Sequence, residues 1–505
     1  ELRLADNPLV TRAVYLCRLR GTAFLPVFCF DPRDFGEEAH TVFGNRKVGA
    51  LRRRFLEESL QDLAVSLAQR GSRLLVCEAA PEVVLPVIAG AGDVVLATRE
   101  ACPEELAAEA RVRDALESIG AELELLDGGG ITLLFGAGEL AAVGLRGGSA
   151  FPEDFRVFYN AVRNNVAKAC LAGLSEAPAQ LPKVCATAAT PPGLRTKEKE
   201  MAGCQLPEAA GPAFRGGETE AHTRLRAWLR GGLKSYKSTF RCLLGDYSSR
   251  LSAHLALGCL SPGRLCAEAL AWVPTGPHVE HFVYEVCWRD YFRHAARRWG
   301  ANLFRQTGPS GVVRVWRQDN QAKERWKSGS TGVPLVDAAM RELVATGYMG
   351  NLARQFTASY FVEELGLDWR EGADWFESCL IDYDPHSNWG QWARTAGVMP
   401  TTETKRQRVG GTRYYDIALE ISGGEAVRYI RGWVPELSAL PDDDLLAPWR
   451  SASAAAAARS YPTEPLCSEA LQHYFEWASL NGGKGCGRGR GSNGKGKEGT
   501  VGSRS

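Results

Sequence analysis

The sequence predicts an α/β domain with a doubly wound parallel sheet, joined by a long connector to an all-α domain and followed by a disordered tail. Three observations lead to this prediction. Short apolar runs alternate with helical patterns over residues 1–127, which is typical of parallel βαβ units. Pro, Gly, Ala and Thr accumulate over residues 128–216, which indicates a connector running over the surface. Helical patterns rich in Trp and Arg follow over residues 217–450, ahead of a low-complexity segment, residues 451–505.

Strands and helices are expected in alternation along the first domain. The apolar residues 24–30 stop at Asp31 and Pro32 and predict a buried strand. Leu and Phe then recur three and four positions apart over residues 51–67 and stop before Gly71, which predicts an amphipathic helix. The remaining expected elements are strands at residues 74–76, 94–96 and 123–126 and helices at residues 83–88 and 104–119. No G-x-G-x-x-G follows any of these strands, so the fingerprint of an ordinary NAD-binding domain is missing.

The second domain is expected to contain helices that each end at a turn or a glycine. They lie at residues 281–298, 334–345, 352–365 and 369–380. The tail is Ala-rich and then Gly-rich, with ten Gly in its last 25 residues, so it has too little apolar surface to fold. Those 25 residues carry six basic side chains against Glu498. Contact with RNA or DNA is one interpretation of this tail, and a solvated tail is the commoner one.

Composition narrows the class of protein. At roughly 100–200 residues per domain, the 505 residues, 45% of them hydrophobic, suffice for two or three domains with apolar cores. No run of about 18 uncharged apolar residues is present, so no membrane-spanning helix is expected. The net charge of +1 gives no argument for nucleic acid, and any such site must be a local patch. We expect a monomer.

Cysteine usage points to a reducing environment. The 14 Cys are scattered, the closest pair is Cys259 and Cys266, and C-x-x-C does not occur. This spacing argues against a zinc ribbon, a redox dithiol and a dense disulfide framework. We expect an intracellular compartment, and plastid, mitochondrion, nucleus and cytoplasm all fit. No His, Cys and Asp cluster has the spacing of metal ligands, so no metal is expected.

A hydroxyl-rich segment precedes one apolar helical run. It contains Ser248, Ser249 and Ser252 around Arg250. Ser252 is a natural helix N-cap, and hydroxyl groups together with helix N–H groups can bind an anion. The alternative is a capped helix start without a ligand, which composition alone favours.

Residues 281–298 combine an aromatic face with a charged one. Glu285 and Arg289 lie one helical turn apart, as do Trp288 and Phe292. The usual outcome of this pattern is a salt bridge beside a core stripe. The alternative is an aromatic platform with a nearby carboxylate, which suits a nucleobase.

Residues 380–392 place two carboxylates close together in a largely apolar context. Asp382 and Asp384 are followed by Asn388 and two Trp, and burying these charges without partners would be costly. Arg354, on a separate helix, is a plausible partner for Asp382.

Six sequence segments, in the family's order and spacing, together resemble the photolyase–cryptochrome family, most closely its DASH branch. They are GETEA (217–221), SYKS (235–238), DYSSRLSAHLALGCLSP (246–262), CWRDYFRH (287–294), TGVPLVDAAMREL (331–343) and LIDYDPHSNWGQW (380–392). The likeness extends to about residue 446. It implies an α/β domain, a connector and an all-helical domain that holds a U-shaped FAD.

The resemblance also implies which residues hold FAD. The diphosphate side would be held by Tyr236, Ser248, Ser249, Arg250, Leu251 and Ser252. Arg289 and Asn351 would line the cofactor. Arg354 and Asp382 would form an ion pair beside the isoalloxazine, and Asp384 would contact the flavin or ribose region.

The photochemistry of the family implies a second set of residues. An electron-transfer triad from the flavin to an exposed indole is matched by Trp392, Trp369 and Trp326. Asn388 would face flavin N5, while Glu285 and Trp288 match the carboxylate and the stacking Trp of a pocket for a flipped-out cyclobutane pyrimidine dimer. In this family, light-excited reduced FAD gives the dimer an electron and the ring opens. Flipping the dimer out of the base stack costs less in a single strand than in a duplex, so weak binding of the dimer would favour single-stranded DNA.

Four features depart from the family pattern. The chain opens in the stretch that follows the family's first strand, so we expect that strand to be missing from the sheet. Arg394 stands where an aromatic usually faces the dimer, and Leu352 stands where a basic residue usually contacts DNA phosphate. The connector bears only a loose likeness to the connector of the DASH branch. Glu105 is the candidate contact for a 5,10-methenyltetrahydrofolate antenna.

Three functions therefore stay open. The leading one is FAD- and light-dependent repair of cyclobutane dimers, best in single-stranded DNA, supported by Glu285, Trp288 and Asn388. A blue-light sensor with little repair activity is the second, and Arg394 and Leu352 favour it. The third is a nucleic-acid-binding regulator that acts through its basic tail.

Overall fold

The computed structural model describes residues 1–182, 196, 214–245, 248–400, 424–450 and 460–480. The N-terminal part contains α1 (Pro8–Arg20), β1 (Val27–Cys29), α2 (Pro32–Phe35), α3 (Ala50–Ala68), β2 (Leu75–Cys77), α4 (Pro81–Ile88), β3 (Val94–Thr98), α5 (Pro103–Glu117) and β4 (Glu122–Leu126). Each strand and helix expected here from the hydrophobic pattern is present within a few residues of its expected position. The α/β class of this domain is confirmed.

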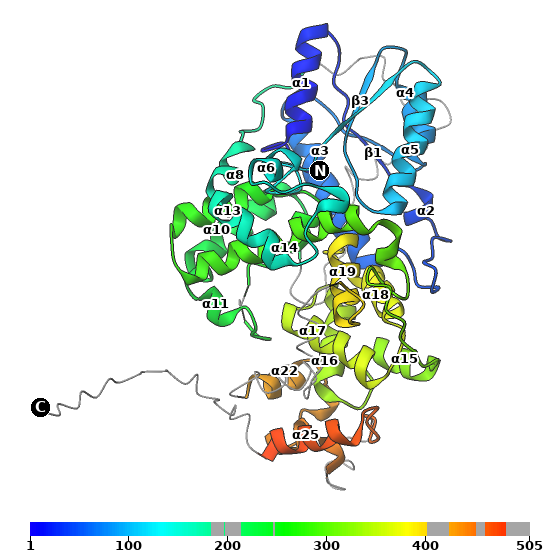
Figure 1. Cartoon of the computed structure of the whole chain (residues 1–505), viewed down its shortest axis with the longest axis vertical. Helices are drawn as coiled ribbons and strands as arrows, with labels where there is room; N and C mark the ends of the chain where they lie inside the picture. The colour runs from blue at the N-terminus through cyan, green and yellow to red at the C-terminus, as the bar shows by residue number, and fades with distance from the viewer. Residues whose placement is uncertain (183–195, 197–213, 246–247, 401–423, 451–459, 481–505) are drawn as a thin grey trace, which may run out of the picture.

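The strands pair in parallel, as the alternating pattern predicts. β1 lies beside β2 with Val27 opposite Leu75, and β3 lies beside β4 with Val94 opposite Glu122. Among the described residues, these pairs form two separate two-stranded sheets. A helix connects the two strands of each pair, α3 in the first and α5 in the second, which is the βαβ arrangement. In Figure 1 the strands lie between α1 and the pair α4 and α5.

The amphipathic pattern of α3 is confirmed by its burial. Its buried positions include Leu56, Leu60, Leu63 and Leu67, three or four residues apart on one face. These side chains belong to the main hydrophobic core, which extends into the helical domain. α3 therefore ties the two domains together through apolar packing.

The connector departs from its expected course over the surface. It forms α6 (Ala137–Ala142), η1 (Gly148–Ala150), α7 (Phe155–Val162), η2 (Arg163–Asn165) and α8 (Val166–Ala172). Phe151, Phe155 and Phe158 are buried, because their rings find apolar partners on the helical domain. The buried Asp290 accepts a 2.8 Å hydrogen bond from the Phe135 N–H and anchors the start of the segment. The surface prediction was wrong for residues 128–182, because it weighed Gly and Pro above these aromatic side chains, whereas residues 183–195 and 197–213 of the predicted connector lie outside the described residues.

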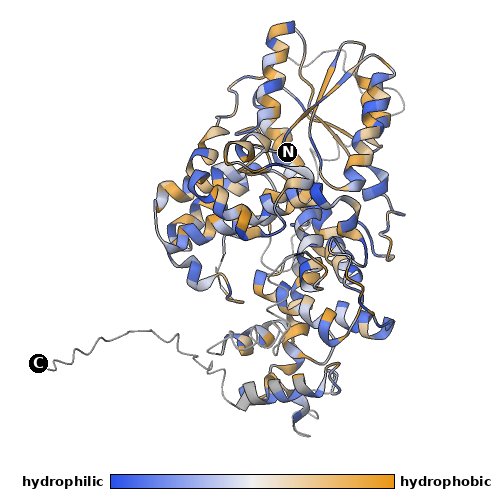
Figure 2. Cartoon of the chain, in the orientation of Figure 1, coloured by the Kyte–Doolittle hydropathy of each residue, from blue (hydrophilic) through white to orange (hydrophobic). Residues whose placement is uncertain are grey.

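The helical domain contains the helices expected from the sequence. It comprises α10 (Glu218–Gly231), η3 (Leu233–Ser235), α11 (Tyr236–Thr239), α12 (Ser252–Ala256), α13 (Pro262–Trp272), α14 (Pro277–Trp299), η4 (Gly300–Phe304), α15 (Asn320–Lys327), α16 (Pro334–Thr346), α17 (Asn351–Ser359), η5 (Tyr360–Glu364), α18 (Trp369–Cys379) and α19 (Pro385–Thr395). The helix expected at residues 352–365 is α17 followed by η5, a π-helical turn. Figure 2 shows polar and apolar residues alternating around these helices, as amphipathic packing requires.

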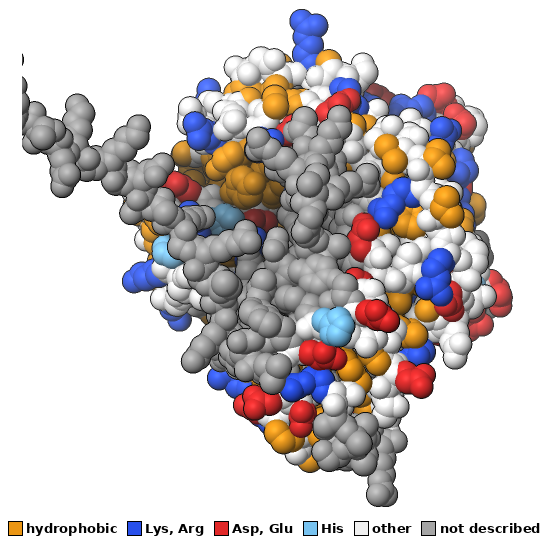
Figure 3. Space-filling model, turned by 60° about the horizontal axis from the view of Figure 1, so that its bottom comes forward, with side chains coloured by type: hydrophobic (Ala, Val, Ile, Leu, Met, Phe, Trp, Pro, Cys, Tyr) orange, Lys and Arg blue, Asp and Glu red, His pale blue; other side chains and the backbone are white. Residues whose placement is uncertain are grey.

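The charges on the described surface are mixed. On the face drawn in Figure 3, basic and acidic side chains are interspersed. This distribution agrees with the near-zero net charge of the sequence. None of the described helices combines the length and the apolar character needed to cross a bilayer.

The C-terminal part is more structured than its composition indicates. It contains α22 (Glu425–Trp433), η6 (Pro435–Leu437), α23 (Asp442–Leu445), η7 (Pro448–Arg450) and α25 (Glu469–Leu480). Leu471 and Phe475 are buried, and the Tyr461 hydroxyl donates a hydrogen bond to the buried Asp337. Disorder over all of residues 451–505 was therefore a wrong prediction for residues 460–480, because a few large apolar side chains suffice to hold this segment. The predicted Gly- and Arg-rich part, residues 481–505, lies outside the described residues.

Candidate functional site

The expected ion pair between Arg354 and Asp382 is confirmed. Arg354 Nη2 lies 2.7 Å from Asp382 Oδ2, and only 3% of the Asp382 side chain is exposed. The same oxygen accepts a 2.6 Å hydrogen bond from the Ser252 hydroxyl. The other carboxylate oxygen, Oδ1, is buried and has no hydrogen-bond partner in the described part of the chain. This group can therefore accept one more hydrogen bond from a bound ligand.

Ser252 does not act as the helix cap that the sequence predicts. α12 begins at Ser252 itself, Leu251 occupies the N-cap position, and no side chain caps this end. The hydroxyl instead donates a 2.6 Å hydrogen bond to Asp382 Oδ2. Ser252 is thereby joined to the charged pair rather than to an anion site on the helix N-terminus.

Asp384 caps α19 and keeps its negative charge. Its Oδ1 accepts hydrogen bonds from the Ser387 N–H at 2.8 Å and from His386 Nδ1 at 2.7 Å. Burial raises the pKa of the Asp384 carboxyl, but the charge and hydrogen bond of His386, with the charge of Arg289, outweigh it. The pKa therefore lies well below its ordinary value, and the carboxylate is ionised at neutral pH.

The salt bridge considered for Glu285 and Arg289 is replaced by other contacts. Arg289 donates to the backbone carbonyls of Thr132 at 3.3 Å and Leu255 at 3.2 Å. Glu285 Oε1 instead lies 3.5 Å from His281 Nε2. Arg289 thus joins the connector to α12 while its charge acts on Asp384.

The remaining residues assigned to the cofactor lie on three elements. The ring of Tyr236 is buried among Trp228 and Phe282. Leu251 is fully buried, whereas Asn351 is exposed at the first position of α17 and its Oδ1 accepts a 3.2 Å hydrogen bond from Gln355.

The hydroxyl-rich segment forms an irregular turn before α12. The carbonyls of Ser248 and Ser249 accept hydrogen bonds from Arg224 at 3.4 and 2.8 Å. Arg250 adopts a left-handed φ of 52°, which is uncommon for a residue other than Gly. Its Nη2 donates to the Gly245 carbonyl at 3.0 Å. The guanidinium groups of Arg224 and Arg250 thus hold this turn in place around a backbone conformation that costs about 1–3 kcal/mol.

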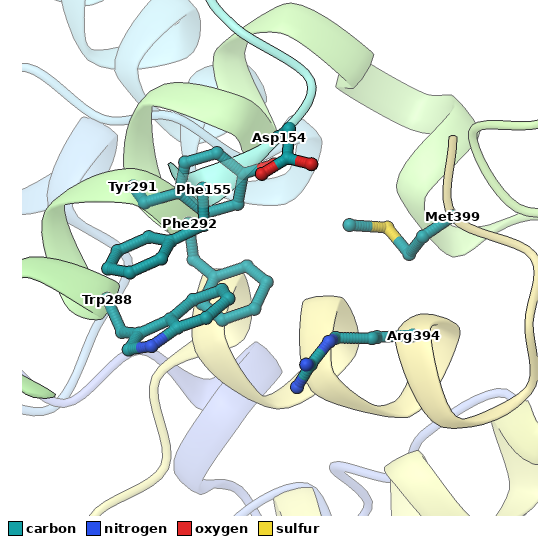
Figure 4. Close-up of a pocket in the computed structure, with 7 residues that line it drawn as sticks. All are labelled: Asp154, Phe155, Trp288, Tyr291, Phe292, Arg394 and Met399. Atoms are coloured by element: carbon teal, nitrogen blue, oxygen red, sulfur yellow. The ribbon is translucent and has the colours of Figure 1, made fainter. Parts of the chain in front are cut away.

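Trp288 lies in a small pocket between the connector and the helical domain. The pocket is lined by Asp154, Phe155, Trp288, Tyr291, Phe292, Arg394 and Met399 (Figure 4). The Phe155 ring stacks on Trp288 with centroids 3.6 Å apart and planes 9° apart. The Arg394 guanidinium lies 5.3 Å from the centre of the Trp288 ring. The sequence missed Phe155, and the only signal for it was the cluster of aromatic residues in the connector.

Glu285 and Trp288 lie on the same helix, α14, as the resemblance implies. Burial raises the pKa of Glu285 to about 7, although the charges of Arg394 and Arg241 oppose the shift. A carboxyl with this pKa can donate or accept a hydrogen bond near neutral pH.

The three Trp residues of the expected triad are all buried. Trp392 is 2% exposed, and Trp326 and Trp369 are 0% exposed, so the expected exposed end at Trp326 was wrong. The Trp326 and Trp392 rings lie 6.1 Å apart, while Trp369 lies 5.8 Å from Trp389. Trp326 is covered because it packs between Phe361 and Phe376.

The outer indole of the triad is expected to be exposed to solvent, and Trp316 is more exposed than Trp326. It is partly exposed, and the Arg314 guanidinium lies 4.7 Å from its ring centre. The next residue, Arg317, donates its N–H to the Gly366 carbonyl at 2.7 Å, close in sequence to Trp369.

Asn388 and Glu105 are both largely buried. Asn388 Nδ2 donates to the Ala373 carbonyl at 2.9 Å, which fixes the amide on α18. Glu105 Oε2 is buried without a hydrogen-bond partner among the described residues, and burial raises the pKa of this carboxyl. The charge of His386, in the helical domain, opposes that shift, so Glu105 faces the boundary between the domains. Within the described ranges, no three His, Cys, Asp or Glu side chains form a group that could hold a metal.

These residues fit a cofactor with a polar ring system. Asp382 has a buried oxygen that needs a donor, and its charge is balanced by Arg354. Asp384 adds a second ionised acceptor. A ring with N–H groups and a ribose with hydroxyl groups, such as those of FAD, would supply the missing donors.

Comparisons with known proteins agree with this fit. Residues 282–473 match the family described as the FAD binding domain of DNA photolyase, and residues 1–182 match DNA photolyase. The chain is 37% identical over 463 residues to cryptochrome DASH of Gloeobacter violaceus, covering 89% of this chain and 87% of that protein. It is 36% identical to the chloroplastic/mitochondrial cryptochrome DASH of Oryza sativa subsp. japonica, covering 87% of this chain and 76% of that one. The crystal structure of a Synechocystis cryptochrome superposes with a TM-score of 0.80 at 33% identity, covering 95% of this chain and 97% of that one. The chain therefore belongs to the photolyase–cryptochrome family, is similar to its cryptochrome DASH members, and carries the family's FAD-binding domain.

Proposed function

We propose that this protein is a blue-light-dependent FAD flavoprotein that repairs cyclobutane pyrimidine dimers, with single-stranded DNA as its preferred substrate. The observation that carries the proposal is the position of Trp288 beside Arg394 at a small pocket, with Glu285 one turn away on the same helix. FAD, when bound in its reduced form and excited, supplies the electron that opens the cyclobutane ring.

On the cofactor side, the protein supplies charge and orientation. Asp382 and Arg354 would hold the polar edge of the ring system, and Ser252 fixes the carboxylate rotamer through its 2.6 Å hydrogen bond. The ionised Asp384 would accept hydrogen bonds from the flavin or ribose region. Asn388, on α19, is fixed by its hydrogen bond to the Ala373 carbonyl of α18 and would present its amide to flavin N5.

On the substrate side, Glu285 is the group that can hold a proton. With a pKa of about 7, a large fraction of this carboxyl is protonated near neutral pH. The protonated form can donate a hydrogen bond to a pyrimidine carbonyl, and Arg394 adds a positive charge nearby. Trp288 would stack on the base, a contact that any pyrimidine can make.

For reduction of the flavin, Trp392 and Trp369 would act with Trp316. Trp316 takes the outer position assigned to Trp326 by sequence, because a partly exposed indole can be solvated when it loses an electron. Trp326 stays a candidate for an inner contact, since its ring lies 6.1 Å from Trp392.

Glu105 would bind a folate antenna of the 5,10-methenyltetrahydrofolate type. Its buried oxygen, which has no partner in the described part of the chain, suits an N–H donor such as those of a pterin ring. Extraction and chromatography of the bound chromophores test this assignment, and Glu105→Gln should reduce the folate content while FAD is retained.

A blue-light sensor with little repair activity is the second candidate. Phe155 covers a face of Trp288, and Arg394 lies beside the same ring, so the pocket is narrow. Illumination of the reduced, FAD-loaded protein with dimer-containing oligothymidine separates the two functions. Recovery of absorbance at the thymine band supports repair, whereas no recovery at full FAD content excludes repair and favours the sensor.

A further inference from the structure

Phe155 makes a contact that neither the cofactor nor the repair chemistry uses. Its ring lies face to face with Trp288, with a 3.6 Å centroid distance and a 9° angle between planes. Phe155 is 4% exposed, so the contact is part of the packed interior. A stacked pyrimidine would make the same kind of contact with an indole.

The connector segment that carries Phe155 is held on α14 by polar contacts. Arg298 Nη1 donates to the Phe151 carbonyl at 2.7 Å, and Arg298 Nη2 lies 2.6 Å from Glu153 Oε1. The Tyr291 hydroxyl donates to the Glu153 carbonyl. Asp154 caps α7 by accepting the Arg156 N–H at 2.7 Å. These bonds form a clamp, consisting of Arg298 and Tyr291, that sets the position of the Phe155 ring.

The pocket beside this stack is too small for a dinucleotide lesion. Its walls are the aromatic cluster on one side and Met399 and Arg394 on the other, as Figure 4 shows. A base that stacks on the covered face of Trp288 must take the place of the Phe155 ring, because two rings cannot share one face at 3.6 Å.

We propose that Phe155 is a resident stacking partner of Trp288 that an incoming pyrimidine dimer displaces, so that Phe155 restricts the pocket to flexible, single-stranded lesions. The inference rests on the proposed repair function and names the residue that sets its substrate preference. In a duplex, the cost of moving Phe155 adds to the cost of flipping the lesion out of the stack. In a single strand, the second cost is small, so the barrier set by Phe155 alone can be overcome.

Phe155→Leu tests the proposal, because it keeps an apolar side chain in the core but removes the stacking ring. Val157→Ala is the matched control, since Val157 lies on the same helix with 56% exposure and lines no described pocket. The probe is a labelled oligothymidine with one cyclobutane dimer, single-stranded or annealed to oligodeoxyadenosine. Its dissociation constant is measured in the dark by fluorescence anisotropy, with undimerised oligothymidine as reference.

Phe155→Leu is expected to bind the dimer about three- to tenfold tighter, the range that an aromatic pair is worth, and to bind duplex dimers measurably. Val157→Ala should match the unchanged protein. Arg298→Gln removes contacts of the clamp but lies outside the pocket, so it should also tighten dimer binding. This variant tests the proposal if Phe155→Leu does not fold. Equal or weaker dimer binding by both variants overturns the inference.

Failure of the proposed function gives a different result. In that case the unchanged protein would bind dimerised and undimerised oligothymidine equally and repair neither in light, which removes both proposals. Dimer-specific binding that Phe155→Leu and Arg298→Gln leave unaltered removes only the role of Phe155.

Discussion

Arg354 and Asp382 form a 2.7 Å ion pair in which one carboxylate oxygen is buried and receives no hydrogen bond from the residues that the structure describes. The pair joins α17 to the turn before α19, and Ser252 adds a bond from α12. Three elements of the helical domain thus converge on one charged group whose last hydrogen bond is left for a ligand. Each of the following predictions tests one such relationship.

Asp382→Asn should reduce the FAD content of the purified protein and destabilise it by about 2 kcal/mol. The change leaves the Arg354 guanidinium without its carboxylate, and removing one partner of a largely buried pair costs more than the pair itself contributes. Flavin absorbance and urea unfolding measure the two effects. Asp114→Asn, at an exposed position of α5, is the control and should change neither. Full FAD content in Asp382→Asn would contradict the assigned role.

Glu285→Gln should alter the dependence of stability on pH. Because the pKa of Glu285 is raised in the fold from 4.5 to about 7, its protonated form is favoured. The native state then binds more protons than the unfolded state between about pH 4.5 and 7, so the Glu285 contribution is fully present below pH 4.5 and is lost as pH rises to 7.

Urea unfolding at pH 5 and pH 8 measures this effect. From pH 5 to pH 8, the free energy of unfolding of the unchanged protein should fall by about 1–2 kcal/mol more than that of Glu285→Gln. This range allows for solvent screening, because part of the Glu285 side chain is exposed. Parallel pH profiles for the two proteins would show that Glu285 is not perturbed.

Trp392→Phe should block photoreduction of oxidised flavin but spare repair by prereduced protein. Removing an easily oxidised ring interrupts electron supply without touching the lesion pocket. Trp316→Phe should slow photoreduction more than Trp326→Phe, because Trp316 is the more exposed ring. Bleaching of the flavin band under blue light measures the rates. A larger loss in Trp326→Phe would return the outer position to Trp326.

Gly372→Ala should distort the Trp392 site. A methyl group at Gly372 would lie 2.3 Å from Trp392 Cη2, so the indole must shift. Overpacking of this kind costs about 1–3 kcal/mol of stability. The variant should therefore unfold at a lower temperature and photoreduce its flavin more slowly. Gly432→Ala, on α22 with nothing near its added methyl group, should be neutral or stabilise by about 0.5–1 kcal/mol.

Tyr461→Phe should destabilise the protein by about 1–2 kcal/mol. It removes a hydrogen bond to the buried Asp337, which also accepts from the N–H and hydroxyl of Thr331 at 2.7 Å. Residues 460–480 should become more sensitive to limited proteolysis, as seen by mass spectrometry. Tyr15→Phe, at a position 55% exposed, should leave the cleavage pattern as it is.

The sequence predicts the local features of this fold well. The apolar face of α3 is encoded in residues three and four apart, and the parallel strand pairs follow from short apolar runs separated by helices. The Arg354 and Asp382 pair was also predictable, because a buried carboxylate needs a partner and Arg354 was a plausible one on a separate helix.

Contacts between distant segments were not predictable in the same way. Phe155 and Trp288 are far apart in sequence, and no periodic pattern relates a connector residue to a particular helix face. The burial of Trp326 depends on Phe361 and Phe376 from two other helices. Ser252 illustrates the same limit, since its type fits a cap while its tertiary neighbour is Asp382.

The contact of Tyr461 with Asp337 has a practical consequence for anyone who shortens this protein. A chain cut after Trp449 would expose the buried carboxylate of Asp337 to water. It would also expose the apolar surface on which Leu471 and Phe475 pack. Loss of yield or of bound yellow pigment in such a truncation would then reflect a damaged scaffold. A cut after Leu480 keeps Tyr461 and all of α25 in the chain.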